Sequence, residues 1–383
     1  MKNENFGLVL STKESDDKKT ARIIGTDFFI LMDLDLNDDV DVKVQDKIPL
    51  GKDSVFVKQE RAHLSYDDLS KDQEFETEKA VYSIVTANEL KYVKFFIDQM
   101  ARFKYNVLQL HLTDDQGWRI EIKSHPKLTE IGAFRNNGKT PSPDNGYYTH
   151  EDIKEIIAYA AERNIEVIPE LDIPGHSVAI LKAYPELGCT FRHNHEKNLG
   201  NTTNMMLCAH QEKVYTIYED IIREVAMLFP SNRIHLGGDE AAVKENWAKC
   251  DDCLAMMQKA GYEKPSQLMI PFFNRMLDIV RKNGKEAILW CELDNIWPPA
   301  NDYLFPYPQD VTLVTWRNAL TPKCIELTEK YGHNLIMAPG EHAYLDYPQF
   351  HGDLPEFNNW GMPVTTLEQS YRLDPGYGLP QAG

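Results

Sequence analysis

The sequence predicts an α/β fold of the (β/α)8 TIM-type barrel class, preceded by a small β-rich segment. From about residue 80 onward, short apolar runs alternate with longer segments whose apolar residues recur at helical spacing. Near-continuous apolar strands are typical of a parallel sheet that is covered on both faces by helices. Seven such strand candidates fit a closed barrel better than an open sheet, and no GxGxxG motif marks a dinucleotide site.

A change in composition divides the chain at about residue 78. We expect residues 1–78 to form a small β-rich segment and a linker, because short β-like runs stand between charged turns and an acidic stretch follows them. Residues 79–383 are expected to form the barrel domain. The strands predicted in it are 81–86, 106–112, 165–171, 233–237, 286–291, 311–316 and 334–338.

Helices are predicted between these strands, and some of their ends carry recognisable signals. Apolar residues recur at helical spacing over 89–104 and over 211–228. Thr149, followed by Asp152, has the spacing of a capping box. Thr321, with the proline that follows it, is typical of a first helical turn.

Charge and hydropathy exclude several classes of partner. The 383 residues carry a formal net charge of −18, which argues against the basic face that nucleic acid or an anionic membrane would need. No apolar run approaches the ~18 residues that span a bilayer. The apolar patch in the first residues, MKNENFGLVL, is too short for a signal peptide. We therefore expect no nucleic-acid partner, no membrane association and no export signal.

The six cysteines suggest neither a disulfide scaffold nor a metal centre. Cys250 and Cys253 form a single CxxC pair, whereas a structural zinc ion needs four ligands. Because a second such pair is absent, a disulfide or two plain thiols is favoured there over zinc. Cys189 and Cys208 flank a polar loop and could pair in an oxidising compartment. No metal and no organic cofactor are expected.

Polar and aromatic side chains gather at the predicted C-terminal ends of the strands, where a barrel carries its chemistry. A single acid in such a place is usually a helix cap, but six strand ends that carry acids, histidine or tryptophan are hard to explain by capping alone. These strand-end residues include Asp114, His176, Asp239, Glu240, Trp290, Glu292, Trp316, Arg317, Tyr344 and Asp346.

Three chemistries compete for this pattern. A metallohydrolase would use His111, His176 and His235, but no strand has an HxH or HExxH spacing, and His111 and His235 fit better as satisfied residues inside the barrel. A nucleotide cyclase would share the letters GGDE, but Ala241 and Ala242 follow them where that signature needs an aromatic residue. Glycoside hydrolysis needs a protonated carboxyl, a stabilising negative charge and aromatic platforms for the sugar, and the acids and aromatic residues at the strand ends are candidates for these roles. Glycoside hydrolysis is therefore favoured.

At this point the chain resembles glycoside hydrolase family 20, the β-N-acetylhexosaminidases, from about residue 89 to residue 378. The resemblance is carried by strand-end motifs that occur in the order of the family. The motifs are NVLQLHLTDDQGWRIEIKSHPKLTEIGAFR, IPELDIPGHS, RIHLGGDE, LWCELDNIW, VTLVTWR and MAPGEHAYLDYPQ. Each motif alone is weak, but the ordered set is very specific.

The resemblance implies a reaction and a role for each matched residue. It implies removal of a terminal β-linked GlcNAc or GalNAc from a glycan by substrate-assisted, retaining catalysis. Glu240 would be the general acid/base, Asp239 would orient the 2-acetamido group whose oxygen attacks, and Tyr344 would hydrogen-bond that oxygen. The remaining implied roles are an acetamido pocket of Trp290, Trp316 and Trp360, a sugar hydroxyl ligand in Asp346, and a relay of Asp114 and His176 behind the acid.

Two departures from the family pattern bear on activity. The family's first barrel strand carries an arginine that binds sugar hydroxyls, and none stands in the matching stretch VYSIVTANEL. After LEQSYRLDP, at 367–375, the family continues into a last strand with a Trp and a Glu, and that strand is absent here. We therefore expect open barrel edges that favour a homo-oligomer, and weak turnover. The alternative function is a catalytically weak or inactive relative that binds sugar.

Overall fold

The computed structural model describes the backbone of seven strands within residues 8–64 and then residues 89–134, 145–190, 205–292, 307–344, 347–350 and 364–373. The chain divides into two compact units. The first comprises residues 1–103 with 142–144, and the second comprises residues 104–141 with 145–383. The boundary predicted at residue 78 and the strand predicted over 81–86 both lie outside the described residues.

The N-terminal unit is built from short antiparallel strands, in agreement with the β-rich segment that the sequence predicts. Three of them form one sheet in the order β1 (Leu8–Ser15), β2 (Lys18–Gly25), β3 (Met32–Asp35). The other two pairs are β4 (Val40–Lys43) with β7 (Arg61–Leu64), and β5 (Ile48–Leu50) with β6 (Asp53–Val55). The unit also includes helix α3 (Glu89–Arg102), predicted over 89–104, which buries Ile97 and Met100.

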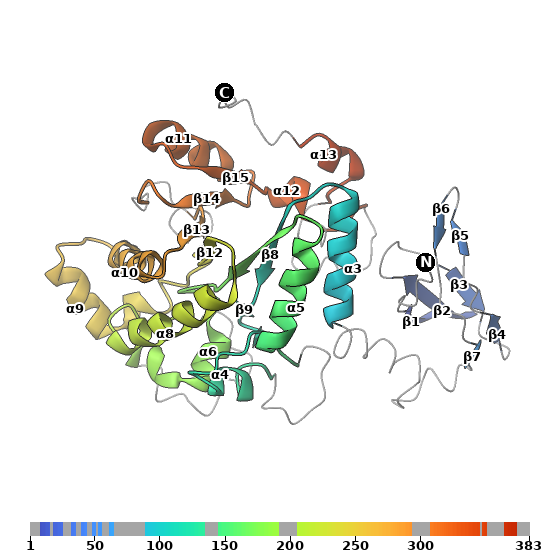
Figure 1. Cartoon of the computed structure of the whole chain (residues 1–383), viewed down its shortest axis with the longest axis horizontal. Helices are drawn as coiled ribbons and strands as arrows, with labels where there is room; N and C mark the ends of the chain where they lie inside the picture. The colour runs from blue at the N-terminus through green and yellow to red at the C-terminus, as the bar shows by residue number, and fades with distance from the viewer. Residues whose placement is uncertain are drawn as a thin grey trace. The chain divides into compact units, whose positions relative to one another are not determined.

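The second unit contains a parallel sheet of six strands, which confirms six of the seven predicted strands. Their order across the sheet is β15-β14-β13-β12-β11-β8, so each strand pairs with its neighbour in the sequence. The sheet curls as in a (β/α)8 barrel, which confirms the predicted fold class (Figure 1). The strand bounds are β8 (Val107–His111), β11 (Glu166–Glu170), β12 (Arg233–His235), β13 (Glu286–Trp290), β14 (Thr312–Thr315) and β15 (Leu335–Met337).

Helices follow the strands and pack against the sheet. Helix α5 packs on β11, α10 packs on β13 and on α8, and α11 packs on β14 and β15 (Figure 1). The described helices of this unit are α4 (Lys127–Glu130), α5 (His150–Ala161), α6 (Val178–Ala183), α8 (Glu212–Leu228), α9 (Asp251–Lys259), α10 (Met269–Lys282), α11 (Thr321–Tyr331), α12 (Gly340–Ala343) and α13 (Leu367–Tyr371). The shorter elements are β9 (Thr113–Asp114), β10 (Gly117–Trp118) and the 3₁₀ turns η2 (Pro185–Leu187), η4 (Trp247–Lys249) and η5 (Pro265–Leu268).

The predicted helix signals operate as expected. The Thr149 backbone N–H donates to Asp152 Oδ2 at 2.8 Å, and the Asp152 N–H donates back to Thr149 Oγ1 at 3.2 Å, which completes the capping box of α5. Helix α11 begins at Thr321. Helix α8 covers the predicted range and buries its apolar face. None of the helices in the described part of the chain is long and apolar enough to span a bilayer.

An apolar layer inside the sheet supports the polar strand ends. Ile168, Ile288 and Val314, from the parallel strands β11, β13 and β14, form a buried cluster. Side chains alternate along a strand, so Glu170 lies on the same face as Ile168, and Trp290 lies on the same face as Ile288. The polar and aromatic side chains at the strand ends therefore lie next to a packed apolar layer, at the edge of the sheet where the site was predicted.

Candidate active site

The turn after β12 brings two carboxylates to one place. Gly237 and Gly238 have φ angles of +66° and +108°, in the region that favours glycine. A Cβ at Gly237 would overlap the Asp172 side chain, so no other residue fits there. Glu240 itself has a φ of +44°, which is uncommon for a residue with a side chain. In a strand, neighbouring side chains point to opposite faces. The turn breaks this alternation, so that Asp239 and Glu240 both approach His176.

His176 lies between these two carboxylates and a third one. Its Nε2 atom is 3.6 Å from Asp239 Oδ2 and 3.6 Å from Glu240 Oε2. Its Nδ1 atom lies 2.9 Å from Asp114 Oδ1. Four residues from three separate strand ends, which the sequence predicts to act together, are thus joined through one imidazole ring.

The charge of this cluster follows from its contacts. Burial disfavours a charged His176, but the hydrogen bond to Asp114 and the carboxylate of Asp239 outweigh burial and raise the pKa of His176 well above its ordinary value. Burial alone would raise the pKa of Asp114. The hydrogen bonds and charges of His111 and His176 outweigh burial and hold this pKa far below its ordinary value. His176 is therefore a cation behind the Asp239–Glu240 pair.

Asp172 holds the turn from below and was given no role at the sequence level. Its backbone N–H donates to Thr113 Oγ1 at 2.8 Å, and its Oδ1 accepts the Gly238 N–H at 3.1 Å. Burial, followed by the charge of Asp239, raises the pKa of Asp172 well above its ordinary value. A neutral Asp172 therefore adds no second negative charge beneath the turn that carries Asp239.

Arg317 is a further residue without a role in the sequence analysis. Its Nη2 atom lies 2.7 Å from Glu240 Oε1, and its guanidinium stacks on the Trp316 ring at 3.6 Å from the centroid. The pair joins the ends of β12 and β14, 77 residues apart in the chain. Arg317 directly follows Trp316, so its place at a strand end was the one available signal.

Two predicted pocket tryptophans each donate a hydrogen bond to a glutamate side chain. Trp290 Nε1 donates to Glu170 Oε1 at 2.9 Å, and Trp316 Nε1 donates to Glu292 Oε2 at 3.0 Å. Glu170 lies at the end of β11 and is 1% exposed, which makes it a fixed acceptor. The two indole rings consequently have one orientation each at neighbouring strand ends.

Two of the three histidines that the metallohydrolase hypothesis used, His111 and His235, contact Glu170. His111 Nδ1 lies 2.9 Å from Glu170 Oε2, and His235 Nδ1 lies 3.3 Å from Glu170 Oε1. His235 is fully buried, as expected for a residue inside the barrel, but its Nε2 atom has no hydrogen-bond partner among the described residues. The expectation was wrong for the burial of His111, whose side chain is 41% exposed because it sits at the rim of the sheet.

The remaining predicted site residues are less closely defined. Tyr344 ends helix α12 beyond β15, and its ring packs edge-on against Tyr347 with centroids 5.4 Å apart. Its placement against the carboxylates stays a prediction. Asp346 and Trp360 lie outside the described residues.

Glu292 provides a test of the site's electrostatics. Burial, together with the charge of Asp239, raises the pKa of Glu292 from its ordinary 4.5 to about 8. The folded state therefore binds this proton more tightly than the unfolded chain does. The resulting stability is complete below pH 4.5 and is lost as the pH rises through about 8.

We expect Glu292→Gln to remove this pH dependence, because glutamine keeps the acceptor for Trp316 and cannot ionise. Melting temperatures measured across this pH range should fall for the wild type and change less for the variant. An equal fall in both proteins would show that Glu292 titrates normally.

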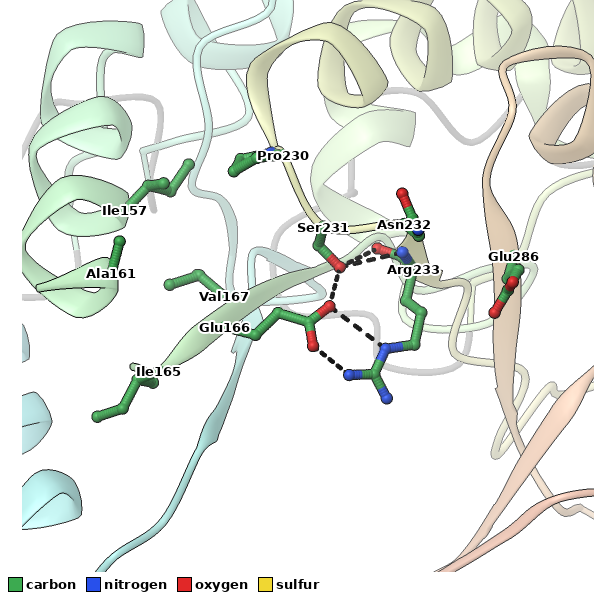
Figure 2. A pocket seen from close by; sticks show the side chains of 10 residues that line it. All are labelled: Ile157, Ala161, Ile165, Glu166, Val167, Pro230, Ser231, Asn232, Arg233 and Glu286. Carbon is green, nitrogen blue, oxygen red and sulfur yellow. Dashed lines mark hydrogen bonds and ion pairs between the residues drawn. The ribbon is translucent and has the colours of Figure 1, made fainter. Parts of the chain in front are cut away.

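A pocket of about 500 Å³ lies at the other end of the strands. It is lined by the first residues of three strands, Glu166, Arg233 and Glu286, and by residues of α5. Figure 2 shows the Glu166 carboxylate and the Arg233 guanidinium pointing toward one another, with the Ser231 hydroxyl donating to the same carboxylate. The N-terminal end of barrel strands generally serves stability rather than chemistry. This pocket is therefore separate from the candidate active site.

Comparison with known proteins gives one long match and one short one. Residues 87–381 match the model of the glycosyl hydrolase family 20 catalytic domain. Residues 9–115 match a protein family of unknown function, DUF655, which adds no activity.

Individual relatives agree with the longer match. A β-hexosaminidase of Akkermansia muciniphila is 38% identical over 294 residues, which is 76% of this chain and 56% of that protein. The crystal structure of a β-N-acetylhexosaminidase is 36% identical with a TM-score of 0.65, covering 76% of this chain and 60% of the other. An exo-β-N-acetylglucosaminidase of Vibrio harveyi in complex with N-acetylglucosamine is 28% identical with a TM-score of 0.62, covering 77% and 45%. The chain spans about half the length of the curated relatives it matches.

Proposed function

Since the chain belongs to glycosyl hydrolase family 20, whose catalytic domain matches residues 87–381, we propose that it is a β-N-acetylhexosaminidase. Its substrate class is a glycan or glycoconjugate with a terminal β-linked N-acetylhexosamine. One observation carries the proposal: Asp239 and Glu240 both lie 3.6 Å from the same nitrogen of His176. This arrangement allows Glu240 to act as the general acid while Asp239 orients the acetamido group of the same sugar.

The proximity of the two carboxylates argues against a nucleophile from the protein. A retaining glycosidase with a carboxylate nucleophile needs that group on the opposite face of the sugar from the acid. Adjacent residues on one turn cannot straddle a ring. The nucleophile is therefore the substrate's own acetamido oxygen, and Asp239 accepts the N–H of that acetamido group and stabilises the positive charge that develops on it.

The reaction then takes two steps with Glu240 acting in both. In the first, the acetamido oxygen bonds to the anomeric carbon while the glycosidic bond breaks and Glu240 protonates the leaving oxygen. In the second, Glu240 takes a proton from water, the water oxygen bonds to the anomeric carbon, and the oxazolinium ring opens. The product keeps the β configuration and Glu240 is protonated again.

His176 and Arg317 prepare the carboxylates for these steps. The His176 cation, anchored by Asp114, lies 3.6 Å from both Asp239 and Glu240 and holds the two side chains close together. Arg317 fixes the other oxygen of Glu240, 2.7 Å away. The tethered rings of Trp290 and Trp316 offer apolar walls for the acetamido methyl group, and Trp360 and Asp346 complete the proposed sugar contacts.

Tyr344 is expected to donate its hydroxyl to the attacking acetamido oxygen. Tyr344→Phe should weaken transition-state binding by ~1–3 kcal/mol, which lowers kcat/KM for N-acetyl substrates roughly 5- to 150-fold. The melting temperature should change little, because the ring that packs on Tyr347 remains. A collapse of the melting temperature with unchanged activity per folded molecule would make Tyr344 a structural residue instead.

The proposed function is tested by comparing two substrates that differ in one group. An aryl N-acetyl-β-glucosaminide should be hydrolysed, whereas the aryl β-glucoside, which lacks the acetamido nucleophile, should not. Hydrolysis of the plain glucoside alone would refute the proposal. Binding of N-acetylglucosamine without turnover of either substrate would favour the alternative, a sugar-binding relative with an incomplete site.

A further inference from the structure

Four buried cysteines from distant parts of the chain meet outside the candidate active site. They are Cys189, Cys208, Cys250 and Cys253, each at most 1% exposed. One sulfur atom from each lies within 4.8 Å of the other three, and the Cys208 and Cys253 sulfur atoms are 3.4 Å apart. All four are thiols rather than disulfides.

This spacing is that of ligands around one metal ion. A tetrahedral zinc ion with Zn–S bonds of about 2.3 Å holds its sulfur atoms about 3.8 Å from one another. Disulfides join sulfur atoms in pairs at about 2.05 Å and give no reason for four to gather around one point. Four thiolates in tetrahedral array are the usual structural zinc set, and iron–sulfur clusters spread their cysteines more widely than a single ion does.

The backbone around each pair of cysteines is well suited to metal binding. Cys250 precedes helix α9 and Cys253 lies in its first turn, where the positive end of the helix favours a thiolate. On the other side, the Cys208 N–H donates to Leu187 O at 2.8 Å, which draws Cys208 next to Cys189.

Hydrogen bonds connect the cysteine cluster to the loop that carries His176 and to the segment that follows Asp239 and Glu240. The Leu207 N–H, next to Cys208, donates at 2.9 Å to the carbonyl of Pro174, in the loop that carries His176. The indole of Trp247, three residues before Cys250, donates at 2.8 Å to the carbonyl of Leu207. Trp247 itself lies on the segment that follows the Asp239–Glu240 turn. The cysteine cluster therefore lies where this segment meets the chain that continues from the His176 loop.

We propose that Cys189, Cys208, Cys250 and Cys253 bind one Zn²⁺ ion as four thiolates. The ion ties the extension of the His176 loop to the segment that follows Asp239 and Glu240, and so it positions the catalytic carboxylates without touching the substrate. This assignment replaces the disulfide or plain thiols expected from the sequence. It does not depend on the reaction proposed above, because its test reads metal content.

The direct test is elemental analysis of the full chain, purified without chelators. We expect one zinc ion per chain, released when a mercurial reagent modifies the thiols. Cobalt(II) in its place should give the intense visible absorption of a tetrahedral thiolate site. Protein with little zinc and four reactive thiols, disulfide-linked peptides among the four cysteines, or iron with inorganic sulfide would each overturn the proposal.

Single substitutions give the matched comparison. Cys253→Ser should lose zinc, whereas Cys324→Ser, which removes a buried thiol from α11 outside the cluster, should keep it. If Cys253→Ser does not fold, zinc can be removed from the wild type instead. Removal of zinc should then speed the amide hydrogen exchange of residues 205–209, and added zinc should restore their protection. Zinc retained in folded Cys253→Ser, or unchanged exchange after removal, would contradict the assignment.

Discussion

Glu240→Gln is expected to lower kcat by about 10²-fold or more on N-acetyl-β-glucosaminides with poor leaving groups. Glutamine keeps the shape of the side chain and its place between His176 and Arg317, but it has no proton to give. The loss should shrink as the leaving group becomes more acidic, because a good leaving group departs without protonation. Values of kcat across a series of aryl leaving groups measure this dependence.

A matched control is available at the other end of the barrel strands. Glu286 is an exposed first residue of β13, and Glu286→Gln removes one carboxylate without touching the site. It should keep the wild-type rates and leaving-group dependence. A Glu240→Gln enzyme that lost activity equally on every leaving group would not have lost a general acid.

Asp239→Asn is expected to lower kcat by about 10²-fold or more on every leaving group. The substitution removes the negative charge that stabilises the developing positive charge on the acetamido group. It also leaves His176 with one carboxylate fewer to balance its own charge. The leaving group plays no part in either effect, so the dependence of the rate on its acidity should match that of the wild type.

The two variants together test the assignment of roles. Plots of log kcat against leaving-group pKa should be steeper than wild type for Glu240→Gln and parallel to wild type for Asp239→Asn. Identical slopes in the two variants would contradict the distinction between an acid and an orienting base, whatever the size of the rate losses.

The strands and the polar rim could be predicted from sequence because each depends on a local pattern. Val107–His111 and Glu286–Trp290 are mostly apolar runs, and a parallel sheet is the fold that buries such runs on both faces. Once the strands are parallel, their C-terminal ends lie at one edge. Asp114, His176 and the Asp239–Glu240 pair therefore had to be neighbours, and the structure joins them.

The interactions that cross between strand ends could not be predicted in this way. The pairs Arg317–Glu240 and Trp316–Glu292 depend on which rotamers meet above the sheet, and no spacing in the sequence encodes this. The cysteine cluster was missed for a related reason. Cys189 and Cys208 are 19 residues apart, which suggested a possible disulfide but lacks the CxxC spacing of a metal-ligand pair. Irregular segments, not regular elements, bring them to Cys250 and Cys253.

The attack by the acetamido oxygen is tested most directly with substrates whose acetyl group carries successive fluorine atoms. Each fluorine withdraws electrons and makes the amide oxygen a poorer nucleophile, while the sugar and the leaving group stay the same. The proposed mechanism predicts that kcat/KM falls steadily from the acetyl to the trifluoroacetyl substrate. Values of kcat/KM that stay constant across the series would mean that another group attacks the anomeric carbon, and would contradict the roles assigned to Asp239 and Glu240.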